Sequence, residues 1–187
     1  MPPRIPPLAD HEMDERQREL IAPYAQDGHT ENVFRTMAQY PGMLRRWGPM
    51  IGHVLVKNSL SLRDREILIL RTGYLCRAEY EWAQHVRIAK GAGMTDGDIA
   101  AIMAGNGLSP HEDALLCAAE ELWRDARIAD ATWVRLAKSF SRDQMMDVVF
   151  TVGQYTLVSM ALNSFGVELD HNVGEYPRLP ARSGAKA

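Results

Sequence analysis

Apolar residues recur at the spacing of one helical face through most of this chain. Between residues 43 and 57, for example, apolar side chains fall three and four positions apart, as along one side of an α-helix. Ser61 and Ser141 each precede such a stretch, and an acidic or amide side chain follows each serine three residues later. That arrangement is typical of a capping box at a helix N-terminus. The pattern therefore predicts a chain built from successive helices.

The expected helices cover almost the whole central part of the chain. They run over about residues 11–24, 32–39, 43–57, 62–74, 79–92, 95–104, 109–127, 130–138 and 142–165. No segment shows the strict two-residue alternation of a half-buried strand. Residues 148–152 form a β-branched cluster, but both flanks continue the helical pattern, so we expect helix there too. The predicted fold class is all-α, a compact bundle of about eight helices.

Both ends of the chain differ in composition from its centre. Four prolines within residues 1–10 remove helical hydrogen-bond donors, and we expect an extended arm there. Residues 174–187 hold prolines, glycines and small side chains, which predicts an extended or frayed tail. A length of 187 residues suits one domain, which we place at 1–187 with its core at about 45–125.

Composition and charge narrow the class of protein. Hydrophobic residues make up 46% of the chain, enough apolar material for a globular core. The net charge of −3 and the isoelectric point near 6.1 argue against a protein that binds nucleic acid through a basic field. No run of about 18 apolar residues occurs, which argues against a membrane span, and no apolar leader follows Met1. Cys76 and Cys117 are too few for a disulfide framework, so we expect a reduced, cytoplasmic protein.

Glu66 is a candidate for chemistry because its helical neighbours are apolar or small. The residues on the same face are Leu62, Ile69, Leu70 and Gly73. A carboxylate in such a stripe needs a partner, or it keeps its proton. The alternative is a glutamate at the edge of the stripe whose carboxylate reaches water beside Arg63 or Arg65.

His85 lies one helical turn after Glu81, so the two side chains can contact each other. A carboxylate at that position can orient the imidazole and raise the pKa of His85, which suits a general acid or base near neutral pH. The alternative is a half-buried histidine in an ordinary ion pair. A metal site is less favoured, because helical carboxylate-bridged iron motifs space the glutamate and the histidine three residues apart.

The two cysteines occur in different surroundings. Cys117 lies in the apolar run 114–119, which predicts core packing. Cys76 stands between two expected helices beside Arg77, where a helix N-terminus and a guanidinium would lower the pKa of its thiol. Cys76 is therefore a candidate redox thiol, with a buried structural thiol as the alternative.

Three stretches together resemble the carboxymuconolactone decarboxylase family, which includes the alkyl hydroperoxidase D-type proteins. They are LRDREILILR at 62–71, CRAEYEWAQH at 76–85 and AKGAGMT at 89–95. The spaced glutamate and histidine, the small residues that end the second helix and the Gly-Met-Thr turn carry the resemblance. The resemblance implies an all-helical fold that assembles as trimers or hexamers.

The cysteines of the peroxidase members do not carry over. In those members a Cys-x-x-Cys pair opens the histidine-bearing helix, and a glutamate on the preceding helix relays protons to it. Glu66 and His85 match that glutamate and that histidine, whereas Ala78 and Glu81 occupy the two cysteine positions. Cys76 lies two residues too early and has no partner three residues on. Because a dithiol cycle needs two thiols, we expect a subgroup without that activity.

The leading hypothesis is a cofactor-free lyase or isomerase of this family that acts on a small carboxylated or lactone-like metabolite. His85 would serve as general acid or base, Glu81 would orient it, and Glu66 would exchange protons with it. Two alternatives stay open. One is a thiol-dependent hydroperoxidase that uses Cys76, and the other is a non-catalytic oligomeric binding protein in which the three residues form a buried polar network.

Four further residues are candidates for lining the pocket or binding the substrate: His53, Tyr80, Trp82 and Arg71. Arginine suits this role because a guanidinium binds a carboxylate bidentately, although each of the four could instead be an ordinary core or surface residue. We expect no metal and no cofactor. The expected partners are a small-molecule substrate and other copies of the chain in a homo-oligomer, with no nucleic acid and no membrane.

Overall fold

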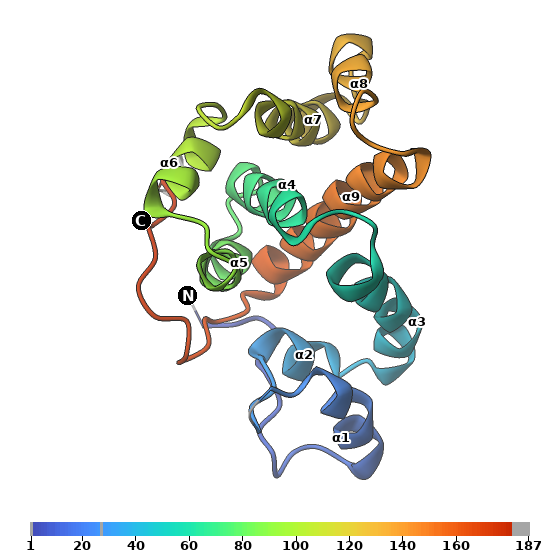
Figure 1. Ribbon diagram of the computed structural model, residues 1–187. Coiled ribbons are helices and arrows are strands. Elements are labelled where there is room, and N and C mark those ends of the chain that lie inside the picture. The colour runs from blue at the N-terminus through green and yellow to red at the C-terminus, as the bar shows by residue number, and fades with distance from the viewer. Residues whose placement is uncertain (1, 27, 181–187) are drawn as a thin grey trace.

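The computed structural model describes residues 2–26 and 28–180, and this part of the chain contains nine α-helices and no β-strand (Figure 1). The predicted all-α class is confirmed. The helices are α1 (Glu15–Ile21), α2 (Asn32–Met37), α3 (Pro41–Gly52), α4 (Leu62–Leu75), α5 (Glu79–Gly91), α6 (Asp96–Ala104), α7 (Pro110–Asp125), α8 (Asp130–Leu136) and α9 (Arg142–Phe165). A short 3₁₀-helix (Ala22–Tyr24) follows α1, and a π-helical turn (His53–Lys57) follows α3.

Helix α4 is the centre of the molecule and packs against α5, α7 and α9 (Figure 1). Four consecutive residues of α4 are completely buried: Ile67, Leu68, Ile69 and Leu70. A helical turn that is apolar on every side is stable only when other elements cover all of it. Burial of each such side chain stabilises the fold by about 1.5–3 kcal/mol, so α4 holds the surrounding helices together.

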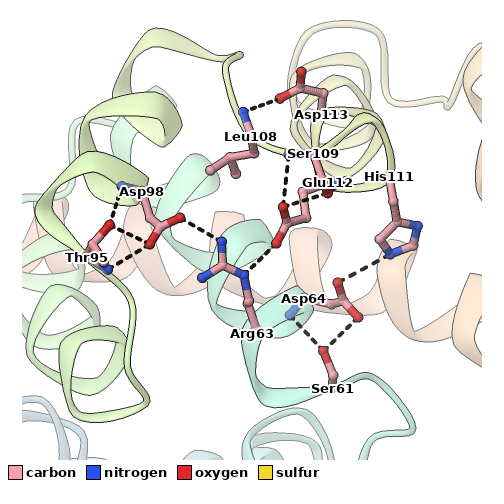
Figure 2. Close-up of polar contacts among 10 residues, drawn as sticks. All are labelled: Ser61, Arg63, Asp64, Thr95, Asp98, Leu108, Ser109, His111, Glu112 and Asp113. Carbon is pink, nitrogen blue, oxygen red and sulfur yellow. Dashed lines mark hydrogen bonds and ion pairs between the residues drawn. The ribbon is translucent and has the colours of Figure 1, made fainter.

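Arg63 connects the beginnings of three helices, as Figure 2 shows. Asp98 and Glu112 are the third residues of capping boxes that start α6 and α7 at Thr95 and Ser109. Nη2 of Arg63 lies 2.7 Å from Oδ1 of Asp98, and Nε lies 2.5 Å from Oε1 of Glu112. Each carboxylate therefore caps its own helix and also binds a guanidinium from α4, which fixes α6 and α7 against the central helix.

The first helix is shorter than predicted. It begins at Glu15 instead of His11, because Asp14 accepts a hydrogen bond from the backbone N–H of Gln17 while the Gln17 side chain accepts one from the backbone N–H of Asp14. It ends at Ile21, where the chain tightens into the 3₁₀-helix that contains Pro23. Proline has no N–H to continue an α-helix, which accounts for the change.

The chain ends are extended, and the described part of the tail is bound to the fold. Residues 2–10 contain no helix, as expected for the proline-rich arm. In the tail, the carbonyl of Pro177 accepts a hydrogen bond from Nε1 of Trp82 at 2.7 Å, and the Tyr176 hydroxyl donates to Glu79 at 2.8 Å. The segment 174–180 is therefore anchored against α5 and not frayed. The rest of the expected tail, residues 181–187, lies outside the described residues.

The last helix, α9, carries both core and surface. Its bounds are those predicted, and the β-branched cluster at 148–152 is helical within it. By length and composition alone α9 could cross a membrane, with a mean hydropathy of 1.3, but half of that apolar window is buried inside the fold. The buried face of α9 includes Tyr155 and packs on α4, α5 and α7. A core helix of a water-exposed protein has these same properties.

Candidate active site

Glu66, Glu81 and His85 form one hydrogen-bonded chain between α4 and α5. Nδ1 of His85 lies 2.6 Å from Oε2 of Glu66, and Nε2 lies 2.9 Å from Oε1 of Glu81. Glu81 and His85 are four residues apart on α5, which places their side chains on one face. Glu66 reaches the imidazole from α4, which packs beside α5. The structure brings together the three residues that the sequence singled out.

Glu66 is fully buried, with 0% of its surface exposed, and both of its oxygens are occupied. Oε2 faces His85, and Oε1 accepts hydrogen bonds from Nε and Nη2 of Arg65 at 3.2 and 3.1 Å. Arg65 also donates to the carbonyl of Leu55, which fixes the guanidinium. A buried carboxylate is tolerated when such partners satisfy it. The alternative of a glutamate that reaches water at the edge of the helix is wrong.

His85 is held as an imidazolium. Burial disfavours the charged ring, but the carboxylates of Glu66 and Glu81 outweigh burial and raise the pKa of His85 to about 10. For Glu66, burial raises the pKa of the carboxyl, yet His85 and Arg65 bring it below its usual value. At neutral pH each ring nitrogen therefore carries a proton and donates it to a carboxylate.

A cavity of about 490 Å³ opens beside His85 and Glu81, which both line it. The lining comes from α5 and α9, from Arg65 of α4, and from side chains within residues 23–26, 31–34 and 47–56. Much of the lining is apolar or aromatic, including Phe34, Trp47, Ile51, Val54, Ile88 and Val158. Glu66 is not among the lining residues. A ligand in the cavity therefore meets Glu81 and His85 directly, while Glu66 contacts His85 from behind the lining.

Tyr155 is a residue of this site that the sequence did not single out. Its ring packs edge-on against the His85 ring, with centroids 5.0 Å apart and planes at 87°. The residue lines the cavity and is 5% exposed, and within the described chain no hydrogen bond occupies its hydroxyl. Burial, followed by the nearby glutamates, raises the pKa of Tyr155 well above its usual value. Tyr155 therefore stays protonated and can donate a hydrogen bond to a ligand.

Arg87 and Glu31 also line the cavity, although neither was predicted to do so. Nη2 of Arg87 lies 3.1 Å from Oε1 of Glu31 and 3.1 Å from Oε1 of Gln84. Glu31 precedes α2, far from α5 in sequence, so no local pattern joins it to Arg87. Glu31 and Arg87 come together only in the folded structure, where the segment that precedes α2 lies against α5.

Of the four candidate pocket residues, one lines the cavity and three do not. Tyr80 lines the cavity, and its hydroxyl donates to Oδ2 of Asp170 at 2.5 Å. Trp82 is completely buried in the core. Arg71 donates to Oε1 of Glu120 at 2.6 Å and to two backbone carbonyls beside α6, so it serves packing on the far side of α4. The structure does not bring Trp82 or Arg71 to the site.

His53 lies at a different surface from the cavity beside His85. Its Nε2 is 2.8 Å from Oδ1 of Asp147, and the backbone N–H and hydroxyl of Ser59 both donate to Oδ2 of the same aspartate. These residues line a separate, open depression between the π-helical turn and α9. His53 therefore does not meet a ligand that is bound beside Glu81.

Cys76 is the first residue after α4, in the turn that joins α4 to α5, and it does not line the cavity. Burial raises the pKa of its thiol above the usual value. The expectation that a helix N-terminus and Arg77 would lower the pKa of Cys76 is wrong, because the sulfur sits at a helix C-terminus and is partly buried. The thiolate is the nucleophilic form, so this environment does not favour redox chemistry.

The donor set does not form a metal centre in the described part of the chain. Among residues 2–26 and 28–180, no group of three or more His, Cys, Asp or Glu side chains is placed to hold a metal ion.

Comparison with known proteins finds a family model that matches the part of the chain holding this geometry. Residues 41–121 match the model of the carboxymuconolactone decarboxylase family. That segment contains α3 to α5 and therefore all three residues of the Glu66–His85–Glu81 chain. No curated protein matches the sequence.

Solved structures share the fold over nearly the whole chain. An uncharacterized peroxidase-related protein from Ralstonia eutropha JMP134, described as an alkylhydroperoxidase AhpD core, is 18% identical, with a TM-score of 0.80, and the match covers 92% of this chain and 95% of that chain. A peroxidase-related protein from Silicibacter sp. TM1040 is 16% identical at a TM-score of 0.78, with the same coverage. A variant of the debrominase Bmp8 in complex with 2,3,4-tribromopyrrole is 13% identical at a TM-score of 0.73, again covering 92% and 95%. These likenesses establish an AhpD-like fold.

Proposed function

We propose that this chain is a member of the carboxymuconolactone decarboxylase and AhpD-like family and is a cofactor-free lyase or isomerase acting on a small carboxylated or lactone-like metabolite. The observation that carries the proposal is the position of Glu81 and His85 on the wall of an apolar cavity. A carboxylate and an imidazolium side by side supply a base and an acid at one place.

Each residue of the Glu66–His85–Glu81 hydrogen-bonded chain has a distinct role in this proposal. Glu81 accepts a proton from a substrate carbon, and His85 donates its Nε2 proton to the substrate. Glu66 stays ionised behind the ring and keeps the imidazole oriented, with Arg65 holding Glu66 in place. The Tyr155 hydroxyl is placed to donate a hydrogen bond to an oxygen that gains negative charge during the reaction.

The proton and electron balance is complete for both reaction types. In an isomerisation, Glu81 removes the proton of a C–H bond, an enolate forms, and His85 returns a proton at another atom. The proton then passes from Glu81 back to His85, which restores the starting state. In a decarboxylation, the electrons of the C–C bond stay on the substrate carbon as CO₂ leaves, and that carbon takes a proton from His85. Solvent then returns a proton to the imidazole.

Two properties of the site favour this function over a thiol peroxidase. Cys76 is outside the cavity and burial raises the pKa of its thiol. Glu81, which stands where the family resemblance would place a cysteine, faces the cavity instead. The debrominase neighbour binds a small substituted aromatic ring, and the apolar lining here is suited to a ring-containing ligand.

The test is a turnover assay on a panel of small lactones, carboxylated lactones and 2-oxo acids. Proton exchange from D₂O is followed by ¹H NMR, and CO₂ release is measured in parallel. We expect Glu81→Gln and His85→Gln to slow the reaction at least about a hundredfold, as is usual for loss of a general acid or base. Glu79→Gln is the matched control, since Glu79 is on the same helix but does not line the cavity.

Other outcomes would overturn the proposal. Equal rates for the wild type and both variants would mean that the reaction does not depend on this proton-transfer pair. Failure to accelerate any compound of the panel, together with rapid peroxide consumption that Cys76→Ser abolishes, would assign the chain to the peroxidases. Failure on the panel with no peroxide consumption would leave a binding protein.

A further inference from the structure

Arg87 presents an incompletely used guanidinium to the cavity beside His85. Its Nη2 donates to Glu31 and to Gln84, each at 3.1 Å. Within the described part of the chain, Nη1 donates no hydrogen bond, and Nε is buried with no partner. A guanidinium binds a carboxylate best through two parallel N–H groups, so Glu31 uses only part of what Arg87 can offer.

The environment of the Glu31 carboxylate is also unfavourable for its charge. It is partly buried, and burial raises the pKa of Glu31 even though Arg87 opposes the rise. Taking a carboxylate partly out of water for a single hydrogen bond is unfavourable. A ligand carboxylate that accepts two hydrogen bonds from the Arg87 guanidinium can therefore replace Glu31 there.

The rest of the cavity defines what such a carboxylate would be attached to. Tyr24 and Phe34 stack with centroids 4.2 Å apart and planes at 8°, and both line the cavity together with Trp47. Aromatic walls of this kind favour a flat apolar body through dispersion and stacking. A volume of about 490 Å³ accommodates a single substituted ring.

We propose that Arg87 is a binding residue for the carboxylate of a small ring-containing monocarboxylic acid, which enters the cavity beside Glu81 and displaces Glu31 from the guanidinium. This inference rests on the proposed function, because it names the group by which that substrate is held. Glu31 and the stacked pair Tyr24–Phe34 lie before residue 41, where the family match begins. Selection of the ligand therefore depends on a part of this chain outside the family core.

The test measures binding and does not need turnover. Ligand-observed NMR titrations use benzoate, cyclohexanecarboxylate and 2-furoate, with benzyl alcohol as the neutral counterpart. We expect the wild type to bind at least one carboxylate, Arg87→Gln to bind it about 10 to 100 times more weakly, and Glu31→Gln to bind it more tightly. Benzyl alcohol should bind the wild type and Arg87→Gln equally. Arg127→Gln is the charge-matched control, because Arg127 pairs with Asp130 on the surface and is 72% exposed.

The outcomes separate this inference from the proposed function. Equal carboxylate binding by the wild type and Arg87→Gln would overturn the inference, and so would absence of binding for all three carboxylates in both the wild type and Glu31→Gln. If Arg87→Gln failed to fold, as judged by circular dichroism, the direction of the Glu31→Gln effect would decide. Carboxylate binding without turnover on the panel would support the role of Arg87 while refuting the proposed chemistry.

Discussion

Glu66 and Glu81 contact opposite nitrogens of a single imidazole, at 2.6 and 2.9 Å, and only Glu81 faces a cavity. The imidazole ring of His85 therefore connects Glu66, which is fully buried, to Glu81, which a ligand in the cavity can contact. Because Glu66 is fully buried, its effect on chemistry passes through the two cavity-lining residues that it contacts, His85 and Arg65. The two glutamates can therefore be separated experimentally, one by its effect on the ring and the other by its effect on substrate.

Replacing Glu66 by Gln should lower the pKa of His85 from about 10 towards the ordinary value near 6.5, because one of its two anionic partners is lost. The imidazole ¹³Cε1 chemical shift against pH measures this directly, with His85→Gln identifying the signal. We also expect the free energy of unfolding at pH 7 to fall by about 1.5–3 kcal/mol, the usual contribution of a hydrogen bond to a charged group.

The sign of the pH dependence follows from the raised pKa of His85. A group whose pKa is higher in the folded state stabilises the fold fully below its unfolded pKa, near 6.5, and loses that contribution as pH rises through about 10. Glu66→Gln should therefore differ most from the wild type near pH 6 and least near pH 10. Glu15→Gln, an exposed change on α1, should show no such convergence. A His85 pKa that stays near 10 in Glu66→Gln would contradict the assignment.

Cys76 should be inert towards peroxide in the reduced native protein. Its thiol is protonated at neutral pH because burial raises the pKa, and the protonated form is a poor nucleophile. Intact mass and free-thiol counts over minutes should show no selective oxidation of Cys76 relative to Cys117. Cys76→Ser should leave turnover of the panel substrate unchanged. Rapid oxidation of Cys76 that a dithiol reverses would instead support a one-cysteine peroxidase.

The helix boundaries that the sequence predicts well are those with a local cap. Ser61 and Ser141 each accept a hydrogen bond from the backbone N–H three residues on, and α4 and α9 begin where expected. The first helix is placed too early because its predicted start does not follow the capping-box spacing of Asp14 and Gln17. Asp10, which lies before the predicted start, has methionine three residues later and so lacks the reciprocal partner.

The candidate site likewise contains residues whose contacts the sequence predicts and residues whose contacts it does not predict. The pairing of Glu81 with His85 follows from helical spacing alone, and the approach of Glu66 from the family resemblance. The cavity wall does not follow from either, because it includes side chains from residues 23–26, 31–34 and 47–56, which are distant in sequence from α5. Arg87 and Tyr155 carry no local signal, since an arginine or tyrosine on an amphipathic helix is usually an ordinary surface or core residue.

Arg63→Ala should weaken the junction of α4, α6 and α7 shown in Figure 2. The guanidinium is 39% exposed, so solvent screening limits the expected loss to about 1 kcal/mol at pH 7. Its hydrogen bonds lower the pKa of Asp98, and its contacts with Glu112, which oppose burial there, also lower the pKa of that carboxyl. The two acids therefore stabilise the fold above about pH 4 and lose that contribution as pH falls.

Urea unfolding at pH 7 and pH 3 tests this account of Arg63. The difference between the wild type and Arg63→Ala should shrink at pH 3, because both carboxyls have higher pKa values in the unfolded chain and their protonation there favours unfolding. Arg127→Ala, which removes an exposed pair with Asp130, should change stability by less than about 0.5 kcal/mol at either pH. A deficit for Arg63→Ala that is equal at both pH values would assign the effect to packing of the arginine stem instead.

The outer face of α9 should join copies of this chain. Its exposed apolar side chains follow helical spacing and form one stripe: Met146, Val149, Phe150, Leu157 and Met160. A continuous apolar stripe of this kind on a folded surface favours burial against a partner, and we propose a second copy, in line with the homo-oligomer that the family resemblance implies. Phe150→Glu and Met160→Glu should each weaken self-association at least about tenfold in sedimentation velocity, because a charge would be buried at the contact.

Val134→Glu, at an exposed apolar position on α8 outside the stripe, should leave association unchanged. A wild type that is monomeric at tens of micromolar, or an unchanged oligomer in both α9 variants, would mean that another surface makes the contact or that none does.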